Sequence, residues 1–402
     1  MIELIQGKEN LLADRAGDEI EIIRKKMEGF FDMKNVYFLF GSGTSCNAIP
    51  KMSALIGDVE TYLNEHCDEK IQKAFNRIVN KKGRNLEEVL GVLYSKRSYL
   101  EGTVLNDTGT ANLETTNNLI ANIESVIFDK LNVGEDNADY AKVLDTYKTF
   151  YQKMALRNKD HSRICVFTTN NDLFNERALD SQNIHYINGF SGGLNRFFNP
   201  ALFNYTMSKR MDTSIDKFEP IENMIYLYKI HGSINWVEDI GIQSNTFFKI
   251  RELSKPDNQE KTVLIYPTPL KQNKSLGSPY MDLFREFQHK LLEPNSVLFV
   301  IGYSFSDEHV NDIIYRALAT NSTMNLVVFG NINEEREVCR ISDNRIFRIR
   351  ELDATGTPLH YFERIVDELL PDLDAFKQED GLLKKFIQEL DASRSLKKNE
   401  DR

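Results

Sequence analysis

The sequence feature that most constrains the fold is an apolar run that ends in a glycine turn. Residues 36–40 read Val-Tyr-Phe-Leu-Phe and lead directly into Gly41-Ser42-Gly43-Thr44-Ser45. A short aromatic and aliphatic run followed by glycines predicts a buried strand that turns sharply. Because glycine lacks a Cβ, Gly41 and Gly43 let backbone N–H groups approach a phosphate at a helix N-terminus. The pattern is typical of a dinucleotide site, although the third glycine of the common fingerprint is absent and a tight turn alone also explains it.

Three further apolar runs end in polar residues. Residues 163–167 precede Thr168-Thr169-Asn170-Asn171-Asp172, residues 224–230 precede His231-Gly232, and residues 297–301 precede Gly302-Tyr303-Ser304. In an open parallel sheet the ligand crevice lies outside the carboxyl ends of the strands, so these distant segments can meet. We therefore predict an α/β fold with a Rossmann-like parallel sheet and one pocket at that edge.

In order and spacing, these motifs resemble the sirtuin-related NAD-consuming fold. Sirtuin motifs read approximately Gly-Ala-Gly-x-Ser, Thr-Gln-Asn-x-Asp, His-Gly and Gly-Thr/Tyr-Ser. The strings His-Gly-Ser-Ile-Asn-Trp at 231–236 and Gly-Tyr-Ser-Phe-Ser-Asp at 302–307 are similar to the bacterial sirtuin-like branch found in antiphage defence. The resemblance covers residues 36–350 in patches, and it implies a sirtuin-like fold with NAD as substrate.

The resemblance implies catalytic roles for Asn170 and His231. A neutral amide such as Asn170 positions a ribose hydroxyl or the attacking water without adding a charge, and Asp172 accepts from the nicotinamide carboxamide. Thr169 stands where sirtuins usually have Gln. His231 follows a strand and, with an ordinary pKa near 6.5, is our first choice for the general base. The alternatives are a turn-forming Asn170 and a structural His231.

The resemblance also implies which residues contact NAD. Thr44 and Ser45 would meet phosphate, Gly302 and Ser304 would meet phosphate or ribose, and Asn331 would meet the adenine-side ribose. The expected NAD-binding set is Gly41, Ser42, Gly43, Thr44, Ser45, Thr169, Asp172, Gly302, Ser304 and Asn331. The alternative for Thr44 and Ser45 is helix capping, and Ser306 or Asp307 would cap the helix after the last motif.

The cysteines carry no metal-binding pattern. Cys46, Cys67, Cys165 and Cys339 are scattered, without a Cys-x-x-Cys pair, so we interpret them as reduced bystanders. Deacylating sirtuins usually hold a zinc ribbon with two such pairs after the His-Gly motif, but no cysteine lies between His231 and Ile301. We predict no zinc ribbon and no metal, which argues against peptide deacylation.

The composition limits the classes of molecule that we expect the protein to bind. The 402 residues include 50 basic and 60 acidic ones, a formal charge of −10, so direct nucleic-acid binding is not expected. No apolar run approaches the roughly 20 residues that span a bilayer, and the N-terminus lacks the basic start and apolar core of a signal peptide. We expect a cytoplasmic protein without membrane contact.

We divide the chain into four segments. Residues 1–52 would hold an N-terminal helix, with helical spacing over 3–31, and the first strand and turn; residues 53–160 would be a helical insertion. Residues 161–358 would complete the NAD-binding domain, with 346–350 as an edge strand. Residues 359–402 would be C-terminal helices with a disordered end over 392–402. The insertion would serve as scaffold or oligomer contact, or as a lid.

The leading functional hypothesis is hydrolysis of NAD to nicotinamide and ADP-ribose, as an antiphage effector that depletes NAD. The resemblance further implies a homo-oligomer and association with a HerA-type ATPase. Two alternatives stay open: an NAD-dependent deacylase or ADP-ribosyltransferase, and a non-enzymatic nucleotide-binding scaffold of a defence complex.

Overall fold

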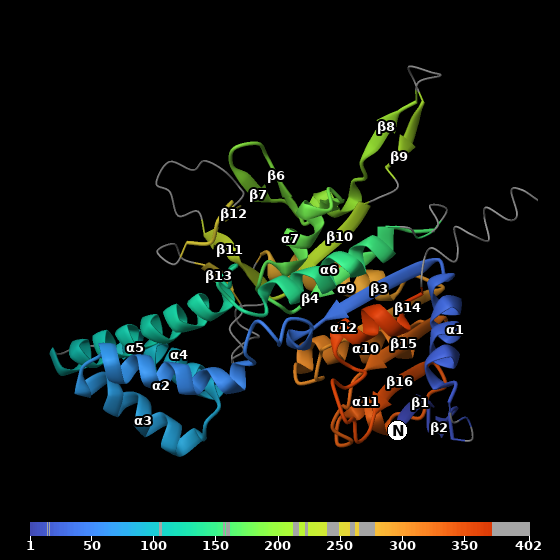
Figure 1. Ribbon diagram of the computed structural model, residues 1–402. Helices are drawn as coiled ribbons and strands as arrows, with labels where there is room; N and C mark the ends of the chain where they lie inside the picture. Colours follow the sequence, from blue (N-terminus) through green and yellow to red (C-terminus); the bar gives the residue numbers. More distant parts are fainter. Residues whose placement is uncertain are drawn as a thin grey trace, which may run out of the picture.

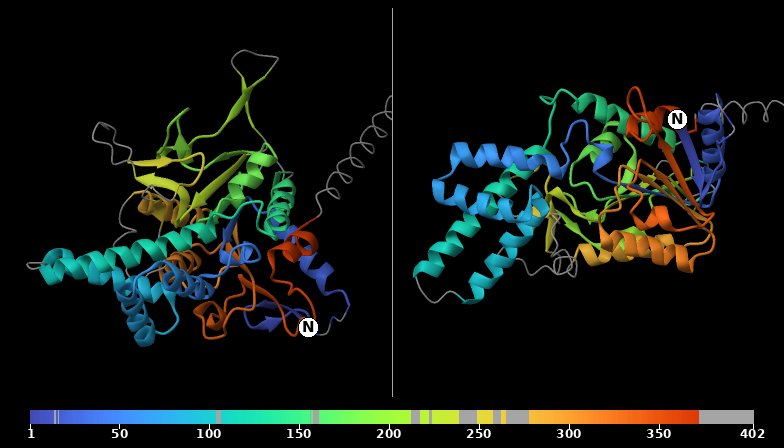
Figure 2. Two further views of the ribbon diagram at one scale, coloured as in Figure 1. Left: turned by 60° about the vertical axis from the view of Figure 1, so that its left-hand side comes forward. Right: turned by 90° about the horizontal axis from the view of Figure 1, so that it is seen from below.

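The described residues form an α/β body from which a helical arm and a β-hairpin project (Figure 1). The computed structural model describes residues 1–13, 15, 17–103, 107–155, 157, 161–211, 217–221, 224–238, 249–257, 262–264 and 278–371. Figure 2 shows from two further sides that the arm extends away from the sheet.

The main sheet has nine strands among the described residues, and seven of them run parallel. In spatial order they are β2 (Glu9–Asn10), β1 (Ile2–Gln6), β16 (Ile346–Glu351), β15 (Met324–Phe329), β14 (Ser296–Ile301), β3 (Asn35–Phe40), β4 (Cys165–Thr168), β10 (Met224–Lys229) and β5 (His185–Ile187). All neighbours from β16 to β5 pair in parallel, and β1 and β2 add antiparallel strands at one edge. The predicted α/β parallel sheet is confirmed.

Helices cover both faces of this sheet. In β3 the side chains alternate, with Val36, Phe38 and Phe40 in one core and Tyr37 and Leu39 in the other. This alternation places apolar groups on both faces of a strand that is buried throughout, as in doubly covered parallel sheets. The first face packs against α1 (Glu19–Phe31), α6 (Tyr140–Ala155), α7 (Phe174–Ser181), α12 (Phe362–Arg364) and the turn η3 (Ile365–Leu369), and the second against α9 (Tyr280–Leu291), α10 (Glu308–Thr320) and α11 (Glu337–Arg340).

The helical arm lies between β3 and α6 in the chain. It consists of α2 (Met52–His66), α3 (Glu69–Lys82), α4 (Leu86–Thr103) and α5 (Asp107–Leu131). In α3, Ile71, Phe75 and Val79 recur every four residues and form one buried face. The arm has its own hydrophobic cluster, which also takes in Leu173 and Ile234 of the body.

The described residues also form two smaller antiparallel sheets. The first contains β13 (Thr262–Leu264), β11 (Gly232–Glu238), β12 (Ile250–Glu252), β7 (Arg196–Phe198) and β6 (Phe190–Ser191); the second is the projecting hairpin β8 (Ser208–Arg210) and β9 (Phe218–Pro220). Short turns complete the set, η1 (Ser42–Thr44) and η2 (Pro200–Asn204). Gly232 has a φ of 83°, so the chain turns there from β10 into β11. His231 thus lies where the main sheet meets the small one.

Two element predictions at the N-terminal edge are wrong. The helix predicted over residues 3–31 exists as α1, but residues 2–6 form β1, because five residues are too few for their apolar spacing to distinguish a strand from a helix. Since β1 pairs with β16, residues 346–350 lie inside the sheet rather than at its edge. An ion pair between Glu3 and Arg350 crosses this unpredicted pairing.

The C-terminal helices are shorter than predicted where they are described. After Pro358 the chain forms α12, the single turn η3 and then extended backbone at Leu370. Residues 372–402, which include the segment predicted to be disordered, lie outside the described residues. The four segment boundaries stay predictions.

The glycine turn after β3 packs directly on the loop after β14. A Cβ added to Gly43 would lie 2.6 Å from Gly302 Cα, and one added to Gly302 would lie 2.6 Å from the Thr44 nitrogen. The Gly43 N–H donates to the Gly302 carbonyl at 2.9 Å, and Gly302 has a φ of 68°. Only glycine fits this approach of two backbones. The turn is therefore explained first by packing between loops.

We expect Gly302→Ala to destabilise the protein, because the added Cβ meets backbone and the left-handed conformation disfavours alanine. The free energy of unfolding should fall by about 2 kcal/mol or more, measured by urea denaturation. Gly57→Ala is the matched control: Gly57 lies inside α2 and its Cβ would have no neighbour within 4 Å. That variant should gain about 0.5–1 kcal/mol. Equal effects of the two changes would contradict the packing explanation.

Candidate active site

Four neighbouring strands bring the motif residues to one edge of the sheet. The strands β14, β3, β4 and β10 are adjacent in that order, and all are parallel. Backbone hydrogen bonds continue past the strand ends: Gly41 N donates to Ile301 O at 2.9 Å, Thr169 N to Phe40 O at 2.9 Å and Ile230 N to Thr168 O at 3.0 Å. The four loops that carry the motifs are therefore held side by side.

Hydrogen bonds fix the orientation of the Asn170 amide. Its Nδ2 donates to Thr44 Oγ1 at 3.0 Å and to Ser45 Oγ at 3.3 Å. Thr44 uses its hydroxyl proton on the Gly41 carbonyl and Ser45 uses its own on Asp172 Oδ2, both at 2.9 Å. Since both hydroxyl oxygens are thereby left as acceptors, the nitrogen of the amide must face them. These contacts fix which end of the Asn170 amide faces the glycine turn.

The helical segment also contributes to this cluster, which the sequence did not predict. Tyr147 of α6 lies 2.7 Å from Thr44 through the two hydroxyl oxygens. Burial, which is complete, raises the pKa of Tyr147 well above its ordinary value, so the phenol stays protonated. Because Thr44 already donates to Gly41, Tyr147 is the donor in this contact. In the sequence, the place of Tyr147 on the apolar face of α6 indicates only a core residue.

His231 is paired with a carboxylate. Its Nε2 lies 3.2 Å from Asp307 Oδ2, and both side chains are nearly buried. Asp307 is one of the two residues predicted to cap a helix, the other being Ser306, and its Oδ1 accepts from His309 N at the start of α10. The second oxygen holds the imidazole, a role that the sequence did not reveal. The Asn171 amide joins this loop to the Asn170 loop by donating to His231 O at 2.9 Å.

A buried lysine lies beneath these loops. Lys229, the last residue of β10, has a fully buried side chain and an ion pair of 2.9 Å with Glu176 of α7. Burial raises the pKa of Glu176, against the opposing effect of Lys229. The sequence analysis missed this pair, although a single lysine in the otherwise apolar run 224–230 was a usable signal.

The other predicted NAD-binding residues occupy the same edge with fewer contacts. Thr169 Oγ1 donates to Phe40 O at 3.3 Å, and Ser304 Oγ donates to Ser306 Oγ at 3.1 Å. Ser42 begins the turn η1, and Asn331 is exposed beyond the end of β15. Their roles in binding stay predictions.

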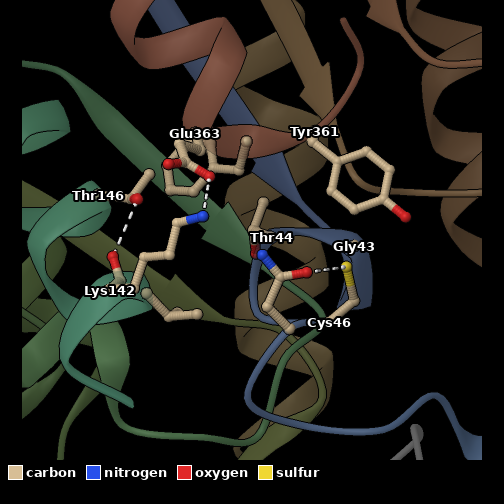
Figure 3. A pocket seen from close by; sticks show the side chains of 10 residues that line it. Gly43, Thr44, Cys46, Lys142, Thr146, Tyr361 and Glu363 are labelled. Carbon is tan, nitrogen blue, oxygen red and sulfur yellow. Dashed lines mark hydrogen bonds and ion pairs between the residues drawn. The ribbon is translucent and has the colours of Figure 1, made fainter. Parts of the chain in front are cut away.

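A small pocket borders the glycine turn on the side of α6 and α12 (Figure 3). Its walls include Gly43, Thr44 and Cys46 together with the ion pair between Lys142 and Glu363, which are 2.9 Å apart. The walls do not include Asn170 or His231. This pocket therefore reaches the candidate site only through the glycine turn.

No group of three or more His, Cys, Asp or Glu side chains in the described part of the chain could hold a metal ion. No helix in that part is both long and apolar enough to cross a membrane.

Comparisons with known proteins agree with this architecture. Residues 164–345 match the SIR2-like domain family, a stretch that runs from β4 to the start of β16 and contains Asn170, His231 and Gly302. No curated protein matches the sequence. The match covers less than half of the chain, and over that stretch the chain is similar to a SIR2-like domain.

Solved structures of Sir2 proteins show only remote similarity. One Sir2 enzyme is 12% identical over 87% of this chain and 97% of its own, with a TM-score of 0.37. A mutant Sir2 homologue in complex with 2′-O-acetyl ADP ribose is 14% identical over 88% and 96%, with a TM-score of 0.37. A Sir2 homologue in complex with NAD is 13% identical over 88% and 94%, with a TM-score of 0.39.

The raised pKa of Glu176 predicts a pH dependence of stability. Its ordinary value is 4.5, and a carboxyl with a higher pKa in the folded protein favours folding below that value and loses this contribution as the pH rises through the folded pKa. Glu176→Gln removes the titration. We therefore expect the variant to gain stability relative to the wild type as the pH rises above 4.5. Urea denaturation at a series of pH values measures the difference, and a difference that falls with pH would contradict the shift.

Proposed function

We propose that the protein hydrolyses NAD to nicotinamide and ADP-ribose. The observation that carries the proposal is the pairing of two loops: one holds an amide with a fixed acceptor oxygen, and the other an imidazole backed by a carboxylate. The SIR2-like domain match supports an NAD-dependent activity for the segment that contains both.

The reaction breaks the bond between nicotinamide and the ribose C1′. The bonding electrons move to the pyridinium nitrogen, which becomes neutral, and C1′ develops positive charge that a water oxygen attacks. A neutral acceptor near C1′ orients that water, or the neighbouring ribose hydroxyl, without competing for the charge. Asn170 Oδ1 is suited to this role because Thr44 and Ser45 hold its amide group.

His231 would take the proton that the attacking water loses. Asp307 holds the ring through its Nε2 and stabilises the imidazolium that forms. A charge-assisted contact of this kind keeps the imidazole in one orientation. Water then completes ADP-ribose, and the proton leaves to solvent.

Water is the proposed acceptor because the sequence lacks the zinc ribbon that deacylating sirtuins use beside the acyl-lysine groove. We further propose, from the resemblance alone, an antiphage effector that works in the cytoplasm as a homo-oligomer with a HerA-type ATPase. NAD enters as substrate, without a resident metal.

Alanine substitutions test the reaction. Asn170→Ala and His231→Ala should each lower nicotinamide release from NAD by about 100-fold or more, since each removes a group that acts on the reacting atoms. Asn118→Ala and His309→Ala are matched controls: Asn118 is exposed on α5, and His309 is exposed on α10 next to Phe284. Chromatography of nicotinamide and ADP-ribose measures the rates. Full activity in both site variants would refute the assignment, and release that depends on an added acetyl-lysine peptide would favour the deacylase.

Asp307→Asn tests the imidazole pairing separately from folding. Asparagine caps helices as well as aspartate does, so α10 should keep its start and the melting temperature should change little. Loss of the charge beside His231 should lower kcat by about tenfold or more, equivalent to ~1.4 kcal/mol. An unchanged kcat would show that Asp307 only caps the helix.

A further inference from the structure

We propose that Lys229 is a positioning residue that holds the Asn170 loop in register with His231. The proposal rests on the function proposed above. Lys229 touches none of the reacting atoms and acts through the backbone of the loop between β4 and α7, so its role differs from those of Asn170 and His231.

The Lys229 ammonium group joins three separate segments. Its Nζ donates to the carbonyl oxygens of Asn171, at 3.4 Å, and of Asp172 in the loop after β4. It also donates to Ser233 Oγ at 2.7 Å, at the start of β11. The fourth contact is the ion pair with Glu176 of α7, so one charged group binds both sides of the candidate site.

The contacts continue from Lys229 to the catalytic amide. The residue whose carbonyl binds Lys229, Asp172, uses its side chain to hold Ser45, and Ser45 in turn accepts from the Asn170 amide. On the other side, the Asn171 side chain donates to His231 O, and the Asn171 carbonyl accepts from Ile234 N at 3.1 Å. A shift of the Asn171–Asp172 backbone would therefore move both reactive groups.

Stability alone is a weak explanation for this arrangement. Burying an ion pair costs desolvation that the attraction between the charges recovers only in part, and apolar pairs of similar volume are often equally stable. An apolar side chain at 229 would fill the space but leave the Asn171 and Asp172 carbonyls without this donor. The role of Lys229 is therefore to fix the orientation of two backbone carbonyl groups next to the reaction centre.

Three variants separate positioning from ion pairing. Lys229→Met combined with Glu176→Gln removes the donor without leaving a buried charge behind. Glu176→Gln alone keeps Lys229 on the two carbonyls. Lys290→Met is the matched control, because Lys290 forms a 2.8 Å ion pair with Glu293 near the amino end of β14, at the opposite edge of the sheet.

The primary measurement is amide hydrogen exchange of segments 169–174 and 231–234, with the melting temperature and NAD kinetics beside it. We expect exchange about tenfold faster in both segments of the double variant, with β3 unchanged, and kcat lower by about tenfold at a nearly constant KM. Glu176→Gln and Lys290→Met should keep wild-type exchange in these segments and wild-type kcat.

Each other outcome overturns the proposal. Wild-type exchange in the double variant would show that Lys229 does not hold the loop, and an equal loss in Glu176→Gln would show that the ion pair alone matters. If the double variant does not fold, a loss of protection in Glu176→Gln alone still overturns the proposal. If the wild type does not hydrolyse NAD, the proposed function fails, whereas the exchange data still decide whether Lys229 fixes the loop.

Discussion

The parallel pairing of β3 with β14 and β4 is the constraint on which the rest of the structure depends. It sets four strand ends at one edge, and the backbone hydrogen bonds beyond those ends continue into the motif loops. Because the strands are buried on both faces, a one-residue slip in register would move each side chain from one core into the other and disrupt the packing of both. The positions of Gly43 and Gly302, and through them Thr44, follow from this register.

The helical arm is tied to the same edge. Its hydrophobic cluster includes Leu173, directly after Asp172, and Ile234, three residues after His231. The arm therefore packs on the two loops that carry the candidate catalytic groups, while Tyr147 of α6 contacts Thr44 from the sheet side. The helical arm therefore supports the candidate site as well as forming a projecting surface, because Leu173 and Ile234 belong both to its hydrophobic cluster and to the two loops.

The sequence predicted the strands and their shared edge well, because each apolar run ends in glycine or polar residues and parallel strands leave few topologies. It did not predict contacts that depend on tertiary distance. Asp307 read as a helix cap, and only the fold shows that its second oxygen meets His231. Residues 2–6 were mistaken for helix because their pairing with β16 joins the two ends of the described chain. Local patterns carry no information about such pairings.

The distribution of charge around the site matches what cleavage of a cationic pyridinium needs. In the proposed reaction the group next to the sugar is the neutral amide of Asn170, and the carboxylates of Asp172 and Asp307 each contact a protein group, Ser45 or His231. The Lys229 side chain lies below the loops, against backbone carbonyls and Glu176. In the proposed reaction, a lysine that reached the sugar would oppose the developing positive charge, and the buried position of Lys229 avoids this. A lysine can therefore support the proposed site only from a position away from the substrate.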